Sequence, residues 1–293
     1  MAHDIDYIDH TGILTRDLDK LEERYEAFGF TLSPRSRHML NDSPGAPLVP
    51  TGTANRCALF GESYIELLGI VDESAPDPWQ AKRVADQYEG FRILNVGCGD
   101  AEEVYRRLGE AGLSSSGVLS LERDVDTVEG TRTMRARSVH VDPRRTPEGY
   151  FGIAQHLTPE YIHQPRYLDH PNGALRVGAV LIVATDDEYD AYVERYARLL
   201  GRTPAAEGAR QVLSLRAGRL EIVRSSALED VLPGESAFAP APSYFAAMSI
   251  VVADLAAART LIEGNGVATR TLGDGFLVSA RDAYGASLIF TAR

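Results

Sequence analysis

One pattern occurs four times along the chain and limits the possible folds more than any other feature. In each copy an apolar, β-like stretch leads to an aspartate, about three helical turns with one apolar face follow, and a glycine comes after the helix. An aspartate caps a helix N-terminus and a glycine adopts the positive φ of a C-terminal cap, so each copy predicts a strand followed by a helix. The aspartate and the glycine are twelve residues apart in the first, second and fourth copies and fifteen residues apart in the third. The four pairs are Asp17 and Gly29, Asp100 and Gly112, Asp186 and Gly201, and Asp254 and Gly266.

Short β-rich stretches follow every predicted helix. The first copy continues with NRCALF and SYIELLGI, and the last with TRTLGDGFLVSA and ASLIFTA. Each copy is therefore a βαβββ module. A single module leaves a sheet face and an edge uncovered, so we expect two modules to pair around one core. The sequence thus predicts an α+β fold of four βαβββ modules paired into two domains.

The length of 293 residues also favours two domains, since domains commonly have about 100 to 200 residues. The stretch 158–176 contains three prolines and an Asn-Gly pair, which is typical of a linker. We predict a first domain over residues 1–164 and a second over 165–293. We assume that module one pairs with module two and module three with module four. Pairing of module one with module four stays open.

Composition narrows the class of partner. A net charge of −12 and a pI near 5.1 argue against binding to nucleic acid or to an anionic membrane, so a small molecule is the expected partner. The N-terminal stretch lacks a signal-peptide pattern and no segment is apolar enough to span a membrane, which predicts a cytoplasmic protein. Cys57 and Cys98 are expected to be free, buried thiols.

Two polar residues stand out in apolar strands of the first module. His10 lies within the first predicted strand, and Glu66 lies between Ile65 and Leu67 in the last. A buried carboxylate is costly unless it is paired or binds a metal. The alternatives to a functional role are that His10 is a histidine of the core and that Glu66 is a solvated carboxylate that faces outward. The seven histidines are at positions 3, 10, 38, 140, 156, 163 and 170, so composition excludes a histidine-containing metal site in the second domain.

The tandem modules, with a histidine in the first strand and a glutamate in the last of module one, resemble the vicinal oxygen chelate superfamily. Glyoxalase I, extradiol dioxygenases, and fosfomycin and bleomycin resistance proteins belong to it, and the chain most resembles bacterial glyoxalase-like domain proteins. The resemblance rests on IDHTGILTRDLD, GTANRCALFGESYIELLGI, QHLTPEYIHQP and HPNGA. It implies curved, mostly antiparallel sheets, with a divalent metal and a substrate with adjacent oxygens inside the curved sheet.

For this chain the resemblance implies that His10, Glu66 and His156 bind the metal, with Gln155 or Glu160 as alternatives to His156. Two imidazoles and a carboxylate suit Fe(II), Mn(II), Zn(II) or Ni(II) and leave coordination positions for a substrate. Superfamily members usually take two ligands from each module, whereas module two here offers Ile93 or Asn95 on its first strand and Ala154 opposite Glu66. This departure leaves open weak metal binding or none.

Further residues are expected around this site. Asn55 and Arg56 begin a strand predicted to line the site, where Arg56 could pair with a substrate carboxylate or enolate. The loop over residues 36–55 is long and rich in Pro, Gly, Ser and Asn, which indicates a functional loop. We predict Glu66 and Arg56 as catalytic residues, and the expected substrate-binding residues are Asn55, Arg56, His38, Tyr150 and Phe151.

Two functions follow from these expectations. The first is a metal-dependent enzyme with isomerase, lyase or extradiol-dioxygenase chemistry on a small oxygenated substrate. The alternative is a non-catalytic protein that binds or sequesters a small molecule, as the bleomycin-binding members do. A regulatory sensor is weaker, because no DNA-reading element is evident. The second domain is expected to support a homodimer or to form a wall of the substrate site.

Overall fold

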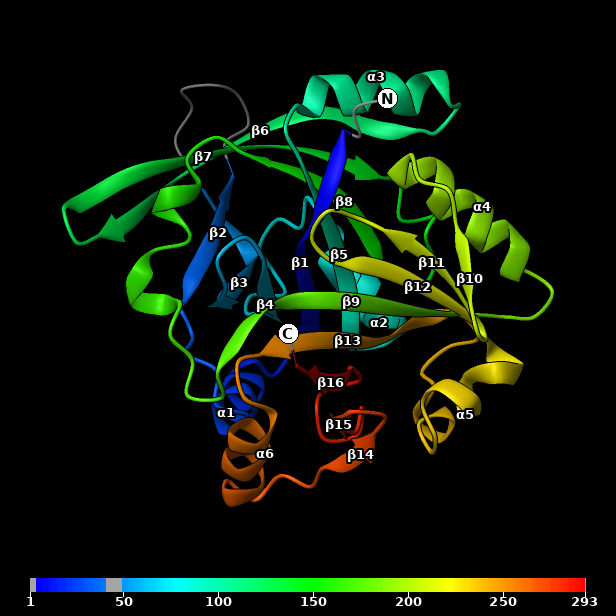
Figure 1. Ribbon diagram of the computed structural model, residues 1–293. Coiled ribbons are helices and arrows are strands. Elements are labelled where there is room, and N and C mark those ends of the chain that lie inside the picture. Colours follow the sequence, from blue (N-terminus) through cyan, green and yellow to red (C-terminus); the bar gives the residue numbers. More distant parts are fainter. Residues whose placement is uncertain (1–3, 41–48, 293) are drawn as a thin grey trace.

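Two eight-stranded mixed sheets, one from each half of the chain, form the frame of the protein (Figure 1). The structure is a computed structural model that describes residues 4–40 and 49–292. Sheet A has the strand order β2-β3-β4-β1-β5-β8-β7-β6, and sheet B has the order β10-β11-β12-β9-β13-β16-β15-β14. The two orders correspond strand for strand, as expected for two copies of one paired-module unit.

The strands of sheet A come from the first half of the chain. They are β1 (Ile5–Thr15), β2 (Ser36–Leu40), β3 (Val49–Leu59), β4 (Tyr64–Ile70), β5 (Gly90–Cys98), β6 (Ser115–Thr127), β7 (Gly130–Val141) and β8 (Tyr150–His156). Those of sheet B are β9 (Ala174–Ala184), β10 (Ala205–Glu207), β11 (Arg210–Ser214), β12 (Arg219–Arg224), β13 (Tyr244–Val252), β14 (Arg270–Leu272), β15 (Gly275–Val278) and β16 (Ser287–Thr291).

The α-helices are α1 (Leu18–Ala27), α2 (Ala81–Gln87), α3 (Ala101–Glu110), α4 (Tyr189–Leu200), α5 (Leu228–Val231) and α6 (Leu255–Gly264). Short 3₁₀ helices lie at Pro159–Tyr161, Pro165–Tyr167, Ser225–Ala227 and Ser236–Phe238. Four of the helices, α1, α3, α4 and α6, are the helices of the four predicted modules. The other two, α2 and α5, lie in connections between modules.

Helix capping follows the repeat in three of its four copies. The side chains of Asp17, Asp100 and Asp254 accept hydrogen bonds from backbone N–H groups in the first turns of α1, α3 and α6. In the third copy the three additional residues move the helix start to Tyr189, and Asp186 instead accepts hydrogen bonds from Ser225 and Ser226. Local capping therefore defines where most of these helices begin.

Module pairing is sequential. The first strand of module one, β1, pairs antiparallel with the first strand of module two, β5, and β9 pairs in the same way with β13. The α+β fold of paired βαβββ modules is thus confirmed, and the alternative pairing of module one with module four is wrong. The boundary between residues 164 and 165 stays a prediction.

The two halves pack against each other through a shared apolar core. Phe91 of β5 lies 5.4 Å from Phe245 of β13, measured between ring centroids. Between the halves the fully buried Glu148 accepts hydrogen bonds at 2.5 Å from both Arg195 and Tyr196 of α4. Cys57 and Cys98 are free and buried, as predicted. No helix within the described residues is long and apolar enough to cross a membrane.

The concave faces of the two sheets differ. In sheet B, side chains from the strands pack against the segment that carries α5, through residues such as Leu181, Tyr244 and Leu228. In sheet A the concave face instead encloses two cavities, and every residue that lines them belongs to the first 167 positions. Of the predicted second domain, Tyr167 lines the second cavity, but no described residue lines the main cavity, so the expectation that this domain forms a wall of the substrate site is wrong for the main cavity.

Candidate functional site

The main cavity lies on the concave face of sheet A and has a volume of about 220 Å³. Its two ends differ in chemistry. Around Tyr64 and His10 the lining is polar, whereas Leu14, Leu68 and Ile93 form an apolar end against which Val84 of α2 packs. A mostly apolar cavity with a few convergent polar groups is the usual form of a small-molecule site.

A β-bulge shapes the polar end. In the pairing of β1 with β5, Ile8 is opposite Val96 and His10 is opposite Asn95, so Asp9 is an additional residue on β1. Regular alternation would place Asp9 and His10 on opposite faces of the sheet, but a bulge changes the direction of the additional side chain. Asp9 Oδ2 consequently lies 2.6 Å from Nδ1 of His10.

Asp9 also contacts the second predicted imidazole. Its Oδ1 lies 2.9 Å from Nε2 of His156, and the Asp9 side chain is fully buried. Burial alone would raise the pKa of Asp9, but the charge of His156 and the hydrogen bond from His10 hold it well below its usual range. Burial lowers the pKa of His156, and the neighbouring Asp9 outweighs this and raises it above 6.5. Asp9 and His156 therefore form a buried ion pair.

His10 is held in a defined orientation. Because the carboxylate of Asp9 accepts a hydrogen bond from Nδ1, the proton lies on that nitrogen and Nε2 faces the cavity. There the side-chain amide of Asn95 donates to Nε2 at 2.8 Å. The ring stacks on Tyr64 with a centroid distance of 4.3 Å. A carboxylate on Nδ1 is also the arrangement that orients histidines for metal binding.

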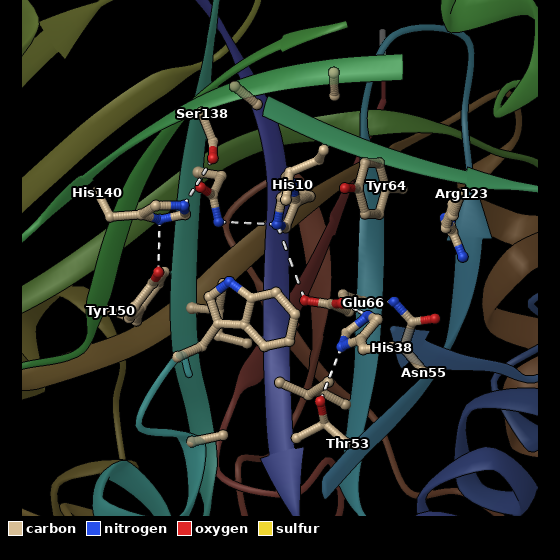
Figure 2. A pocket seen from close by; sticks show the side chains of 18 of the residues that line it. His10, His38, Thr53, Asn55, Tyr64, Glu66, Arg123, Ser138, His140 and Tyr150 are labelled. Atoms are coloured by element: carbon tan, nitrogen blue, oxygen red, sulfur yellow. Dashed lines mark hydrogen bonds and ion pairs between the residues drawn. The ribbon is translucent and has the colours of Figure 1, made fainter. Parts of the chain in front are cut away.

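Glu66 lies beside His10 inside the cavity (Figure 2). Its Oε2 is 3.9 Å from His10 Nε2, and its Oε1 accepts a hydrogen bond of 2.6 Å from the amide of Asn55. Glu66 is only 8% exposed. The imidazole and the carboxylate from opposite ends of module one therefore meet on one face of the sheet.

His38 of β2 adds a second imidazole to this pair. Its Nε2 lies 3.8 Å from Oε1 of Glu66, and its Nδ1 forms a hydrogen bond of 2.9 Å with the hydroxyl of Thr53. Trp79 contacts the ring edge-on. Burial lowers the pKa of His38, which favours the neutral imidazole that metals and substrate hydroxyls prefer.

Tyr150 lines the opposite side of the main cavity together with His140. The Tyr150 hydroxyl is 2.5 Å from Nδ1 of His140, whose Nε2 forms a hydrogen bond of 2.8 Å with Ser138. Burial lowers the pKa of His140 to about 4, so this imidazole is neutral at physiological pH. His140 was not among the residues predicted to line the site.

Two residues predicted to line the site point elsewhere. Arg56 bonds to the backbone oxygen of Ser33 at 2.7 Å and forms ion pairs with Glu22 and Glu26 of α1. Phe151 is fully buried on the opposite face of β8, against Tyr196 of α4. Strand side chains alternate, so Asn55 and Tyr150 face the cavity and the residues that follow them face away. The predicted placement of Arg56 and Phe151 is corrected accordingly.

The predicted ligand set is only partly brought together. His10 and Glu66 face each other, whereas His156 lies against Asp9, and neither of its ring nitrogens has a hydrogen-bond partner among the described residues. Gln155 bonds to the backbone of Gly99 and Ala101 instead. Within residues 4–40 and 49–292 no three His, Cys, Asp or Glu side chains have the spacing of a preformed metal site. Of the predicted functional loop over residues 36–55, positions 41–48 lie outside the described residues.

In sheet B, the carboxylate that corresponds to Glu66 is neutralised by arginines. Glu221 of β12 is the counterpart of Glu66, and it forms ion pairs with Arg210 at 3.0 Å and with Arg219 at 2.6 Å. The counterpart of His10 is Ala179. Sheet B thus retains the carboxylate but has neither the histidine nor the open space.

A family model described as a glyoxalase-like domain matches residues 8–200, which include all of sheet A except the first three residues of β1. The chain belongs to this glyoxalase-like family. A search of curated proteins finds no match. The expected superfamily is thereby confirmed.

Solved structures share this fold across nearly the whole chain. A hypothetical protein from Staphylococcus aureus has a TM-score of 0.63 at 14% identity, with 99% of this chain and 100% of that chain covered. A mutant 4-hydroxymandelate synthase from Streptomyces coelicolor has a TM-score of 0.57 at 13% identity, with 99% and 94% covered. A Mn(II)-bound glyoxalase from Novosphingobium aromaticivorans has a TM-score of 0.55 at 9% identity, with 99% and 83% covered. At these identities the likeness shows the fold alone.

Proposed function

We propose that this glyoxalase-like protein is an enzyme that acts on a small oxygenated substrate in the main cavity of sheet A, with a divalent metal ion bound by His10, Glu66 and His38. The observation that carries the proposal is the meeting of His10 and Glu66 at the polar end of this cavity. The metal-binding glyoxalase with the same fold supports it. A small-molecule partner is part of this proposal, and a homodimer stays a prediction.

The donor set fits such an ion. Two imidazole nitrogens and a carboxylate suit Mn(II), Fe(II), Ni(II) or Zn(II). Each donor has an orienting partner, since Asp9 bonds to His10, Thr53 to His38 and Asn55 to Glu66. These partners leave both Nε2 atoms directed to the carboxylate.

The spacing defines what must change when an ion binds. Neighbouring ligands of one ion lie about 3 Å apart, given metal–ligand distances of roughly 2.0 to 2.2 Å. The separations of 3.8 and 3.9 Å around Glu66 are longer, so the side chains must move closer together. The amide of Asn95 must also leave Nε2 of His10. His38 replaces His156 in the proposed set because His156 is paired with Asp9.

The remaining roles belong to the protein's own side chains. When bound, the metal would act as a Lewis acid on a substrate with neighbouring oxygens. Asn55 holds one oxygen of Glu66, which leaves the other free to accept a substrate proton. The apolar lining around Leu68 and Ile93 limits the access of water.

A second function has its own support. The Asn95 amide already occupies Nε2 of His10, and Ala154 stands where module two would carry a carboxylate. Both features favour a protein that binds a small molecule in the main cavity without metal catalysis. Metal binding separates the two functions.

The test is titration of chelator-treated protein with Mn²⁺ by isothermal calorimetry, for the parent, His10→Ala and Glu66→Gln. Glu221→Gln, which changes the corresponding carboxylate of sheet B, is the matched control. We expect one ion per chain in the parent and in the control, and an affinity at least about 100-fold lower in the two site variants, because each loses a ligand. A folded parent that binds no Mn²⁺, or site variants that bind as the parent does, would leave the binding protein as the better account.

A further inference from the structure

Arg123 of β6 lies where two cavities meet. The second cavity has a volume of about 230 Å³ and lies between residues 33–36, residues 123–126 and the segment 161–167. It shares lining residues with the main cavity, namely Asn55, Tyr64, Arg123, Met134 and His156. A ligand that enters the main cavity from this side passes Arg123.

Arg123 also joins the two edges of sheet A. Strands β2 and β6 are the first and last in the sheet order, and Arg123 Nη1 donates a hydrogen bond of 2.6 Å to Ser36 Oγ of β2. Through this contact Arg123 has a structural role, because it connects β2 to β6. The contact uses one of the five N–H donors of the guanidinium, in a residue that lines both cavities.

No carboxylate within residues 4–40 and 49–292 pairs with Arg123. The acidic residues beside it on β6 are exposed and have other partners, since Glu122 at the edge of the main cavity pairs with Arg135, and Asp124 at the edge of the second cavity bonds to Thr133. Arg56 is neutralised by Glu22 and Glu26, whereas Arg137, which lines the main cavity but not the second one, has no ion pair among the described residues. The cation inside sheet A is therefore available to a ligand.

The charge of Arg123 acts on the site described above. Arg123 lines the same cavity as His38 and Glu66. Figure 2 draws Arg123 near Tyr64, on the same side of the cavity as Glu66, His38 and Asn55. The guanidinium is thus within electrostatic reach of the proposed active site.

The opposite end of the main cavity is apolar. Along β4, Tyr64 is level with His10, and Leu68 is level with Leu14. Four residues of a strand span about 13 Å, so the cation and the apolar end are separated by the length of a small molecule. Trp79 also lines the main cavity, and its ring lies 5.4 Å from that of His38, measured between centroids.

We propose that the ligand of the main cavity is an aromatic or aliphatic carboxylate, whose carboxylate binds Arg123 and whose apolar body lies against Leu68, Ile93 and Trp79. A guanidinium with free donors matches a carboxylate in shape and charge. This inference rests on the proposed function, in that it takes the main cavity as the substrate site, and it names the class of substrate.

The test measures binding of phenylalkanoic acids, from phenylacetate to 6-phenylhexanoate, and of the corresponding primary amides, by isothermal calorimetry. Chelator-treated protein is used, so that the result does not depend on a metal. We expect the parent to bind its best acid at least about tenfold more tightly than the matching amide, and Arg123→Gln to lose this preference. Trp79→Ala is expected to weaken acid and amide alike.

Two control variants distinguish ligand binding by Arg123 from its structural contact with β2. Ser36→Ala breaks the contact between β2 and β6 but keeps the cation, and Arg135→Gln removes an outward arginine of the same hairpin. Both are expected to keep the preference for the acid. The proposal is overturned if no acid of the series binds the parent, if acid and amide bind equally, or if Arg123→Gln keeps the preference. None of these results bears on Mn²⁺ binding by His10 and Glu66, which is measured separately.

Discussion

At the scale of single residues, Asp9 organises the polar end of the main cavity. Its carboxylate contacts His10 through one oxygen and His156 through the other, and it is fully buried. A buried charge that loses its partner is costly, so this residue couples the stability of the first half to the orientation of His10.

We predict that Asp9→Asn lowers the free energy of unfolding at pH 6 by about 3 kcal/mol, because a buried ion pair is broken. The raised pKa of His156 means that the stabilisation is complete below 6.5 and is lost as pH rises through the higher pKa of the folded state. Because the pKa of Asp9 is lowered in the folded state, the stabilisation by this ion pair is lost at acid pH only below 3.8. Urea unfolding between pH 5 and 9 should show the difference between the two proteins shrinking above neutrality.

Asp124→Asn is the control for this prediction, since Asp124 is an exposed carboxylate that bonds to Thr133. It should change the free energy of unfolding by less than about 0.5 kcal/mol at every pH. A difference for Asp9→Asn that stays constant from pH 5 to 9 would contradict the ion pair with His156.

The sequence predicted part of the site and missed the rest for identifiable reasons. His10 and Glu66 were detectable because they are polar residues in apolar strands. Arg56 and Phe151 were misplaced because each follows a residue that faces the cavity, and neighbours in a regular strand face opposite sides. Asp9 was missed because its orientation depends on a β-bulge, and no pattern in the sequence predicts this bulge. Arg123 was missed because β6 alternates exposed and half-buried residues without an apolar face.

At the scale of elements, capping and periodicity were sufficient for the helices of the modules, since Asp17, Asp100 and Asp254 act within one helical turn. The helix α2 was not predicted, although its Val84 packs against the apolar end of the main cavity. Its first residue follows Gln80, which has a positive φ and makes no side-chain cap. The carboxylate of Asp77 instead accepts hydrogen bonds from the backbone N–H groups of Ala81 and Lys82, so the capping residue stands three positions before the usual one.

Close packing between β5 and β8 gives a prediction at this scale. A Cβ atom on Gly152 would lie 2.1 Å from Oδ1 of Asn95, and the same Asn95 donates to His10. Gly152→Ala must therefore displace Asn95, and we expect a loss of about 1 to 3 kcal/mol in the free energy of unfolding. Urea unfolding of Gly152→Ala and of the control Gly99→Ala checks this.

The control is chosen because a Cβ on Gly99 meets no atom within 4 Å. It should be nearly neutral. Equal stability of Gly152→Ala and the parent would mean that Asn95 is not fixed beside His10.

At the scale of the whole molecule, one unit is used twice with different outcomes. The two sheets have the same strand order, yet sheet A encloses cavities and the concave face of sheet B is packed with apolar side chains. The sequence indicated this difference, because no histidine lies beyond position 170. It did not show how the face of sheet B is covered, since α5 and its neighbouring segment have no counterpart in the repeat.

The glyoxalase-like fold alone does not define the reaction, since one fold serves many chemistries. The central claim is that His10 and Glu66 share a ligand in sheet A. Anomalous diffraction from crystals soaked in Mn²⁺ tests it most directly, with sheet B as an internal control. We predict a peak within about 2.0 to 2.3 Å of His10 Nε2 and of Glu66, and none beside Glu221. Crystals with Mn²⁺ at surface carboxylates but none between His10 and Glu66 would contradict the account.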